Sequence, residues 1–245
     1  MRRLLITFIL LSFWVHSFGQ FQINAILNFF DFDELNQELA LNQFPIFDNE
    51  AYTFEAFNTT YDNEDSKVGT RNGFLYTLFE TEGDPTNLGT PNSTRDVDMR
   101  SIGFFSGLEI PIIKTKIITL APSLDFILSQ QRLRVSKNFP SNTTFGNLIG
   151  GDPEVETFRN IRLMFDGRIN LLLHFPSRAN KATYGIGLTG GYRLDPWTPT
   201  WKFERLEKVE IDGSKQNGFH IGLTLTIKFP KFNPPPLPKK REQRS

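Results

Sequence analysis

The chain of 245 residues contains no cysteine, and this absence excludes several classes of protein at once. A disulfide-stapled domain, a zinc–thiolate site, a thiol nucleophile and a lipid-modified N-terminal cysteine all require that residue. Histidine is scarce as well, because the chain has only His16, His174 and His220. A histidine-rich metal site is therefore not expected, and the sequence predicts neither a metal ion nor a cofactor.

The chain also lacks an excess of charge of either sign, with 27 basic and 27 acidic residues. A nucleic-acid-binding protein usually carries a strongly basic surface, so no nucleic-acid partner is expected. After the first twenty residues, no apolar run reaches the ~18 residues that a membrane-spanning helix needs.

The N-terminus has the pattern of a secretory signal peptide. Arg2 and Arg3 precede an apolar run from Leu4 to Val15, and Ser17 and Gly19 supply small residues before a cleavage site. We therefore expect residues 1–19 to direct export, the alternative being an uncleaved anchor. An exported chain without spanning helices can still be a membrane protein, because closed β-barrels satisfy every backbone polar group within lipid.

Alternation of apolar with small or polar residues dominates the rest of the chain. The stretch GFHIGLTLTIKF (218–229) places Phe, Ile, Leu, Leu, Ile and Phe at every second position. Alternation over about ten residues is typical of transmembrane β-strands. Six further segments share this period: Tyr52 to Asn58, Gly73 to Glu80, Ile102 to Ile112, Ile118 to Leu128, Ile161 to Phe175 and Thr183 to Leu194.

The two faces of these strands differ in chemistry. One face is apolar, and the other carries glycine, threonine and charged residues of both signs, among them Glu55, Glu109, Asp125, Arg162, Asp166 and Arg168. We expect the apolar face to contact lipid and the charged residues to pair across a narrow lumen. In a soluble sheet, the alternative, the polar face would lie in water.

Short and long connections alternate along the chain. The segments Pro111 to Thr115 and Pro176 to Ala182 are short, whereas Thr81 to Met99, Val135 to Glu156 and Asp195 to Asn217 are long and polar. Bacterial outer-membrane barrels have short periplasmic turns and longer extracellular loops. With both termini in the periplasm, every long segment would face outward.

In these features the chain resembles the small outer-membrane β-barrel proteins of diderm bacteria, in the broad class of OmpA- and OmpX-type barrels. The signal, the alternating strands and the final aromatic Phe229 carry the resemblance, and Phe229 resembles the C-terminal signal that the barrel-assembly machinery reads. The resemblance implies an all-β, antiparallel up-and-down transmembrane barrel of about eight strands, monomeric, in the outer membrane. It also implies contact with outer-membrane lipid, and with the assembly machinery during insertion.

The resemblance covers residues 50–229, which are expected to form the barrel. Residues 230–245, rich in proline and basic residues, depart from members that end at the aromatic residue, and we interpret them as a periplasmic tail. Residues 20–49 are interpreted as an N-terminal periplasmic segment. Within it, Asp31 to Gln43 is predicted to form a short helix that lies against the periplasmic mouth or enters the lumen.

The strand count leaves one choice open. Seven alternating segments are recognisable, whereas a closed single-chain bacterial barrel has an even number of strands. The eighth strand is expected either at Gln22 to Phe30 or within Arg132 to Phe145.

An eight-stranded barrel is just filled by its side chains, which disfavours a general porin. We expect a structural, adhesion or ligand-recognition role through the outer loops, with an unidentified extracellular ligand. Trp197, Trp201 and Phe203 are candidates for a membrane-interface girdle or for stacking on a ligand.

Two other functions stay open. A lipid-modifying barrel enzyme would need a nucleophile with a nearby base, for which His220 and Ser129 are the nearest candidates; no motif links them, and no catalytic residue is predicted. The other alternative is a secreted, soluble, calycin-like β domain.

Overall fold

The computed structural model describes residues 19–41, 44–61, 66–82, 94–138, 155–176, 182–197, 200–203, 207–210 and 215–228. The predicted tail, Phe229 and the first 18 residues of the predicted signal peptide lie outside these ranges.

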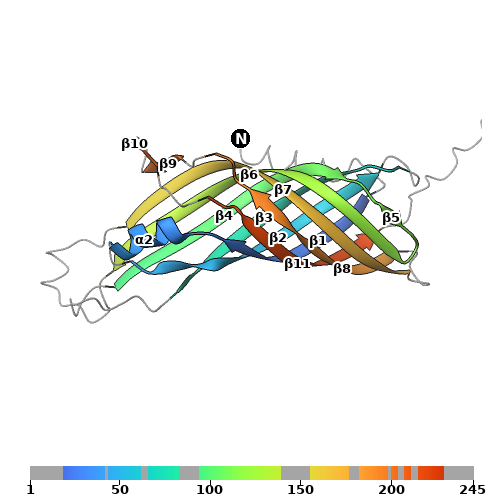
Figure 1. Ribbon diagram of the computed structural model, residues 1–245, viewed down its shortest axis with the longest axis horizontal. Coiled ribbons are helices and arrows are strands. Elements are labelled where there is room, and N and C mark those ends of the chain that lie inside the picture. Colours follow the sequence, from blue (N-terminus) through green and yellow to red (C-terminus); the bar gives the residue numbers. More distant parts are fainter. Residues whose placement is uncertain are drawn as a thin grey trace, which may run out of the picture.

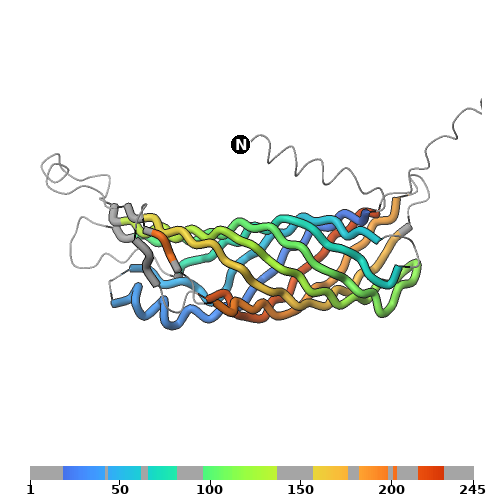
Figure 2. Tube along the Cα trace, turned by 90° about the horizontal axis from the view of Figure 1, so that it is seen from above, coloured from blue at the N-terminus to red at the C-terminus, as the bar shows by residue number. Residues whose placement is uncertain are grey.

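Eight antiparallel strands form a closed ring (Figure 1). In chain order they are β1 (Gly19–Phe30), β2 (Ile46–Tyr61), β3 (Gly69–Glu82), β4 (Thr94–Glu109), β6 (Ile118–Asn138), β7 (Val155–Pro176), β8 (Thr183–Leu194) and β11 (Gly218–Lys228). Each pairs with the next, and β11 pairs with β1. The strands run obliquely around the long axis (Figure 2), as closure of a sheet requires. The prediction of an all-β, eight-stranded barrel is confirmed.

Three short strands and one helix complete the described structure. The strand β5 (Ile113–Lys114) pairs with β6, and β9 (Thr200–Phe203) pairs with both β7 and β10 (Glu207–Glu210). The helix α2 spans Asp33–Leu41. No helix in the described part of the chain is long and apolar enough to cross a membrane.

The eighth strand is β1, which pairs with β11 along its length from Gln20 opposite Lys228 to Phe30 opposite Gly218. The interpretation of residues 20–49 as a segment outside the barrel is therefore wrong. Its alternation is less regular than that of β11, because Ile26 and Phe30 face inward beside Gln22, Asn24 and Asn28. The segment Arg132 to Phe145 begins within β6, which continues to Asn138.

The two ends of the barrel differ. At one end lie the start of β1, the end of β11 and the connections β2–β3, β4–β6 and β7–β8; we call it the turn rim. At the other end, the loop rim, lie the longer connections β3–β4, β6–β7 and β8–β11. The helix α2 joins β1 to β2 at the loop rim (Figure 1). The helix was predicted to lie against the periplasmic mouth or to enter the lumen, and the periplasmic mouth corresponds to the turn rim. Because β1 crosses the barrel before the helix begins, α2 lies at the loop rim instead.

The outer wall is apolar around the ring. In β11, Phe219, Ile221, Leu223 and Leu225 are between 56% and 69% exposed, whereas the residues between them are buried. Similar exposed hydrophobic residues occur on the other strands, for example Phe54, Ile102, Leu124, Ile169 and Leu188. We call this surface the apolar belt. A soluble protein that exposes a contiguous apolar surface of this kind would associate through it.

Glycines let β8 approach β7 closely. A Cβ atom at Gly187 or Gly191 would collide with the carbonyl oxygens of Leu171 or Gly167 on β7. Side chains at these two positions would force the strands apart, so the inward face of β8 requires glycine there.

Candidate functional site

The middle of the lumen is filled by a network of buried charges centred on Arg168. Its guanidinium group donates to Glu55 at 2.7 and 3.0 Å and to Asp166 at 2.8 Å, and its Nε atom lies 3.4 Å from Asp125. All four side chains have no exposed surface. Such charge-assisted, forked contacts are among the strongest hydrogen bonds in proteins.

Two further arginines complete this lumen network. Arg71 lies 3.2 Å from Asp125, and Arg193 donates to Asp166 at 3.2 Å. The network thus contains three carboxylates and three guanidinium groups, from β2, β3, β6, β7 and β8. Because the two signs are equal in number, the buried charges compensate one another within the barrel.

Hydrophobic side chains contact the arginines of the network. Phe57, Leu75, Phe105, Ile127 and Met164 form a buried cluster. The Arg71 guanidinium lies 4.6 Å from the centre of the Phe57 ring, a distance at which cations are attracted to aromatic faces. The cluster and the network together occupy the same section of the lumen.

The predicted lumen residues fall into three groups. Asp125, Asp166 and Arg168 belong to the lumen network. Glu109 lies toward the turn rim, where Tyr61 donates to it at 2.5 Å. Arg162 lies toward the loop rim and pairs with Asp195. All five predicted residues are buried, at 3% exposure or less.

The sequence interpretation missed Arg71 and Asp195 because both lie beyond the strand ends that it assigned. Arg71 has the same parity as the inward Gly73 and Leu75, so a longer β3 would have included it. Arg193 alternates with the outward Tyr192 and Leu194, so it faces inward and joins the network through Asp166.

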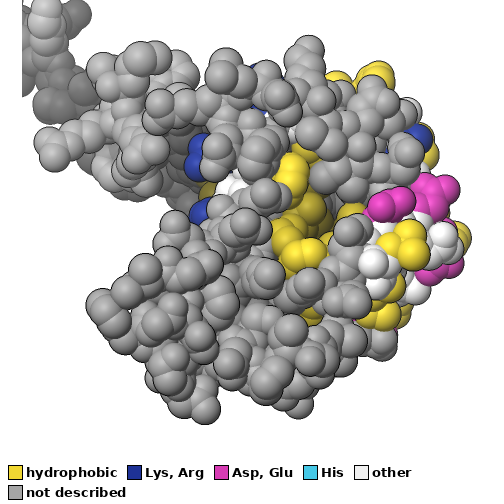
Figure 3. All heavy atoms as spheres, turned by 90° about the vertical axis from the view of Figure 1, so that its left-hand side faces the viewer, with side chains coloured by type: hydrophobic (Ala, Val, Ile, Leu, Met, Phe, Trp, Pro, Cys, Tyr) yellow, Lys and Arg dark blue, Asp and Glu magenta, His cyan; other side chains and the backbone are white. Residues whose placement is uncertain are grey.

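The loop rim is closed by a second, apolar assembly, which we call the mouth core. Its buried members are Phe30, Phe32, Leu35, Leu39, Phe47, Ala51, Phe79, Val97, Met99, Leu133 and Trp201. The Phe32 ring lies 5.8 to 6.0 Å from the rings of Phe30, Phe47 and Phe79. Figure 3 faces this rim and shows hydrophobic side chains at its centre.

The helix α2 is fixed to this mouth by its inward face. Leu35 and Leu39 are buried in the mouth core. The Asn36 side chain donates to the carbonyl oxygen of Phe47 and accepts from its amide, both at 2.8 Å. The Asn36 side chain thus satisfies both backbone polar groups of Phe47, as the backbone of a neighbouring strand would, and holds the helix against the start of β2.

The aromatic residues of the β8–β11 connection lie in different surroundings. Trp201 is fully buried in the mouth core, where the Arg162 guanidinium lies 5.8 Å from its ring centre. The sequence suggested Trp201 as a candidate for stacking on an external ligand, but its burial makes it unavailable for that contact. Trp197 is half exposed and lies 6.1 Å from Phe165 on the outer wall, and the Phe203 side chain lies outside the described residues.

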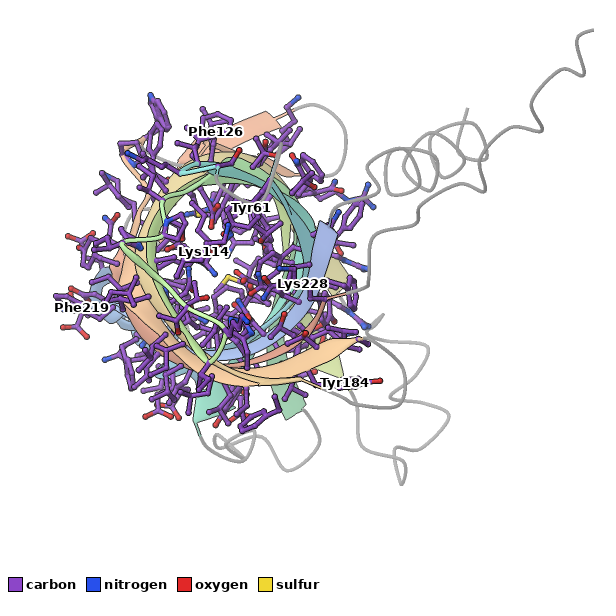
Figure 4. The ribbon with its side chains drawn as sticks, turned by 90° about the vertical axis from the view of Figure 1, so that its right-hand side faces the viewer. Tyr61, Lys114, Phe126, Tyr184, Phe219 and Lys228 are labelled. Atoms are coloured by element: carbon purple, nitrogen blue, oxygen red, sulfur yellow. The ribbon has the colours of Figure 1, made fainter. Side chains whose placement is uncertain are left out.

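The turn rim is narrowed by Tyr61 and Lys114. The Lys114 amino group lies 4.2 Å from the centre of the Tyr61 ring. Figure 4 looks into this rim and shows both side chains inside the ring, with Phe126, Tyr184 and Phe219 projecting outward. The lumen is therefore occupied at both rims and in the middle.

His174 and His220, the histidines of the described residues, form no hydrolytic pair with a serine there. His220 is buried with its Nε2 atom 3.6 Å from Asp166, whereas Ser129 faces inward from β6. No hydrogen bond joins His220 to Ser129 in the described structure, and His174 bonds with Thr119 at 2.9 Å. The three carboxylates of the lumen network face guanidinium groups, and the described residues contain no cluster of three potential metal ligands.

No family model matches the chain, and no curated protein matches it. Among the solved structures that align with the chain are two outer-membrane proteins. One is Ail, the attachment invasion locus protein of Yersinia pestis, with 12% identity, a TM-score of 0.39, and coverage of 87% of this chain and 97% of Ail. The other is a major outer membrane protein from Thermus thermophilus, with 11% identity, a TM-score of 0.40, and coverage of 86% of this chain and 98% of that protein. The fold described above therefore rests on the strand pairing of the chain itself.

Proposed function

We propose that the protein is a pore-free barrel of the bacterial outer membrane that presents its loop rim to the outside. It would serve as a structural or recognition element of the envelope rather than as a channel or an enzyme. Contact with outer-membrane lipid, insertion by the barrel-assembly machinery and a monomeric state belong to the same proposal.

The filled lumen is the observation that carries this proposal. The lumen network closes the middle, the mouth core closes the loop rim, and Tyr61 with Lys114 narrows the turn rim. A diffusive pore needs a continuous water-filled path, as in barrels of 16 or more strands. An apolar belt around a polar interior is, in turn, the arrangement of a barrel that spans lipid.

Planar bilayer recording tests this function. Refolded protein, shown to be inserted by its slower heat-dependent gel migration, should give no stable single-channel steps. Alanine substitution of Phe32 and Leu35 should leave the recordings silent, because the lumen network lies below the mouth core. Stable channels from the natural protein would refute a pore-free role, and full solubility without detergent would refute the membrane placement.

A further inference from the structure

A row of basic residues crosses the outer wall near the loop rim. Arg100 on β4 lies directly opposite Arg132 on β6, which lies opposite Arg159 on β7, which in turn lies opposite Lys202 on β9. All four are exposed, and the described residues on either side of them are buried or, for Phe158, partly buried, so the four side chains point away from the lumen. We call these four residues the basic row.

This register is unfavourable in the protein alone. Side chains directly opposite on neighbouring strands have Cβ atoms about 5 Å apart, and like charges in such pairs repel. Arg100 has a counter-charge, since its Nε atom lies 3.0 Å from Asp98. In the described part of the chain, no carboxylate forms an ion pair with Arg132, Arg159 or Lys202. Among the described residues, the two pairs Arg132–Arg159 and Arg159–Lys202 therefore have no carboxylate that would offset their repulsion.

The basic row begins where the apolar belt ends. One step toward the turn rim on the same face, Arg100 is followed by Ile102 and Arg159 by Ile161, which are 60% and 74% exposed. On β6, Leu128 occupies the same face two steps below Arg132 and is 49% exposed. A molecule that meets the cations and also covers these hydrophobic residues must have an anionic head and an apolar body.

We propose that the basic row binds the phosphate groups of lipid headgroups in the outer leaflet of the membrane, an inference that rests on the proposed membrane placement. Arginine presents a planar fork that matches phosphate oxygens in bidentate fashion. A phosphate between two opposed arginines converts their repulsion into two attractions, while the acyl chains of the same lipid lie on Ile102, Leu128 and Ile161. A soluble polyanion would satisfy the charges but would leave these hydrophobic residues uncovered.

Lipid titration of the folded protein in uncharged detergent tests the proposal. The probes are lipid A with both phosphates and the same lipid without phosphate, and the readout is the temperature at which the heat-modifiable gel band is lost. The phosphorylated probe should raise this temperature and the dephosphorylated probe should not. In an Arg132→Gln/Arg159→Gln variant, binding should weaken by about fivefold per cation, roughly 25-fold in all.

The matched control is Lys116→Gln, which removes an exposed cation at the turn rim and should leave binding unchanged.

A second readout is the difference in unfolding temperature between the double variant and the natural protein, which should change sign when the lipid is added. Without phosphorylated lipid, the double variant should unfold at a higher temperature than the natural protein, because the like-charge repulsion is gone; with the lipid, the order should reverse. If the double variant does not fold, Arg132→Lys/Arg159→Lys keeps the charges and should bind with a smaller loss.

Several results would overturn the proposal. Equal protection by the two lipids, or equal binding by the natural protein and the double variant, would show that phosphate contact at the basic row is absent. Protection by inorganic phosphate or heparin with the same dependence on Arg132 and Arg159 would assign the row to a soluble anion. A chain that stays soluble without detergent would instead refute the membrane placement on which the proposal rests.

Discussion

At the scale of single residues, Arg168 is the side chain on which the lumen depends most. It contacts Glu55, Asp125 and Asp166 at once. Without it, the three buried carboxylates would keep, among the described residues, only Arg71 and Arg193 as charged partners. Removing one partner of a buried ion pair destabilises a protein by more than the pair itself contributes, because the other charge is left buried without compensation.

We therefore expect Arg168→Met to lower the free energy of unfolding in urea by about 3–5 kcal/mol. The control is Arg134→Met, which removes an exposed, outward arginine from β6 and should change the unfolding free energy little. Adding Glu55→Gln to Arg168→Met should recover part of the loss, since it removes one of the stranded charges. A loss for Arg168→Met no larger than that for Arg134→Met would contradict the central role of this guanidinium.

Single residues also show the reach of sequence-based prediction. Period-2 alternation assigns each side chain to a face, and Asp125, Asp166 and Arg168 lie on the face to which it assigns them. Alternation does not reveal which residues meet across the lumen, because that depends on strand register and on strand ends. Glu109 and Arg162 consequently have partners, Tyr61 and Asp195, that no local pattern indicates.

At the scale of secondary-structure elements, α2 shows where sequence patterns fail. Its position in the chain was recognisable from its capping aspartates and from Pro45. Its place in the molecule depended on whether β1 belongs to the barrel, because each additional strand moves the next connection to the opposite rim. The sequence left Gln22 to Phe30 as one of two alternatives for the eighth strand, and because this strand belongs to the barrel, the helix lies at the loop rim and not at the turn rim.

The docking of α2 can be tested at one amide. The Phe47 amide donates to the Asn36 side chain at 2.8 Å, so Asn36→Ala should speed hydrogen exchange at Phe47 by roughly 10-fold, equivalent to about 1.4 kcal/mol. The control Gln37→Ala, on the exposed face of the same helix, should leave that rate unchanged. NMR of the protein in detergent micelles measures both. Equal rates in the two variants would show that the asparagine does not hold the helix.

At the scale of the whole molecule, the proposed orientation follows from the alternation of connections between the two rims. The described chain starts and ends at the turn rim. If export leaves both termini in the periplasm, α2 and the longer connections face outward.

The absence of cysteine makes this orientation directly testable. A cysteine at Gln37, exposed on α2, should react with a membrane-impermeant maleimide on intact cells. A cysteine at Lys116, exposed at the turn rim, should react only after the outer membrane has been permeabilised. Labelling at Lys116 on intact cells, without labelling at Gln37, would show the opposite orientation in the membrane. It would also contradict the assignment of the loop rim to recognition.

The pairing of β1 with β11 also governs how the molecule comes into being. The Gln20 side chain donates to Thr226, 206 positions further along the chain. The ring therefore cannot close until β11 has been synthesised and has reached the membrane. Contacts that span a whole chain form slowly, and until then two strand edges stand open to any other unfinished copy. A chain truncated before Gly218 would therefore be an open sheet with two unpaired edge strands, which would aggregate and would not fold into a smaller barrel.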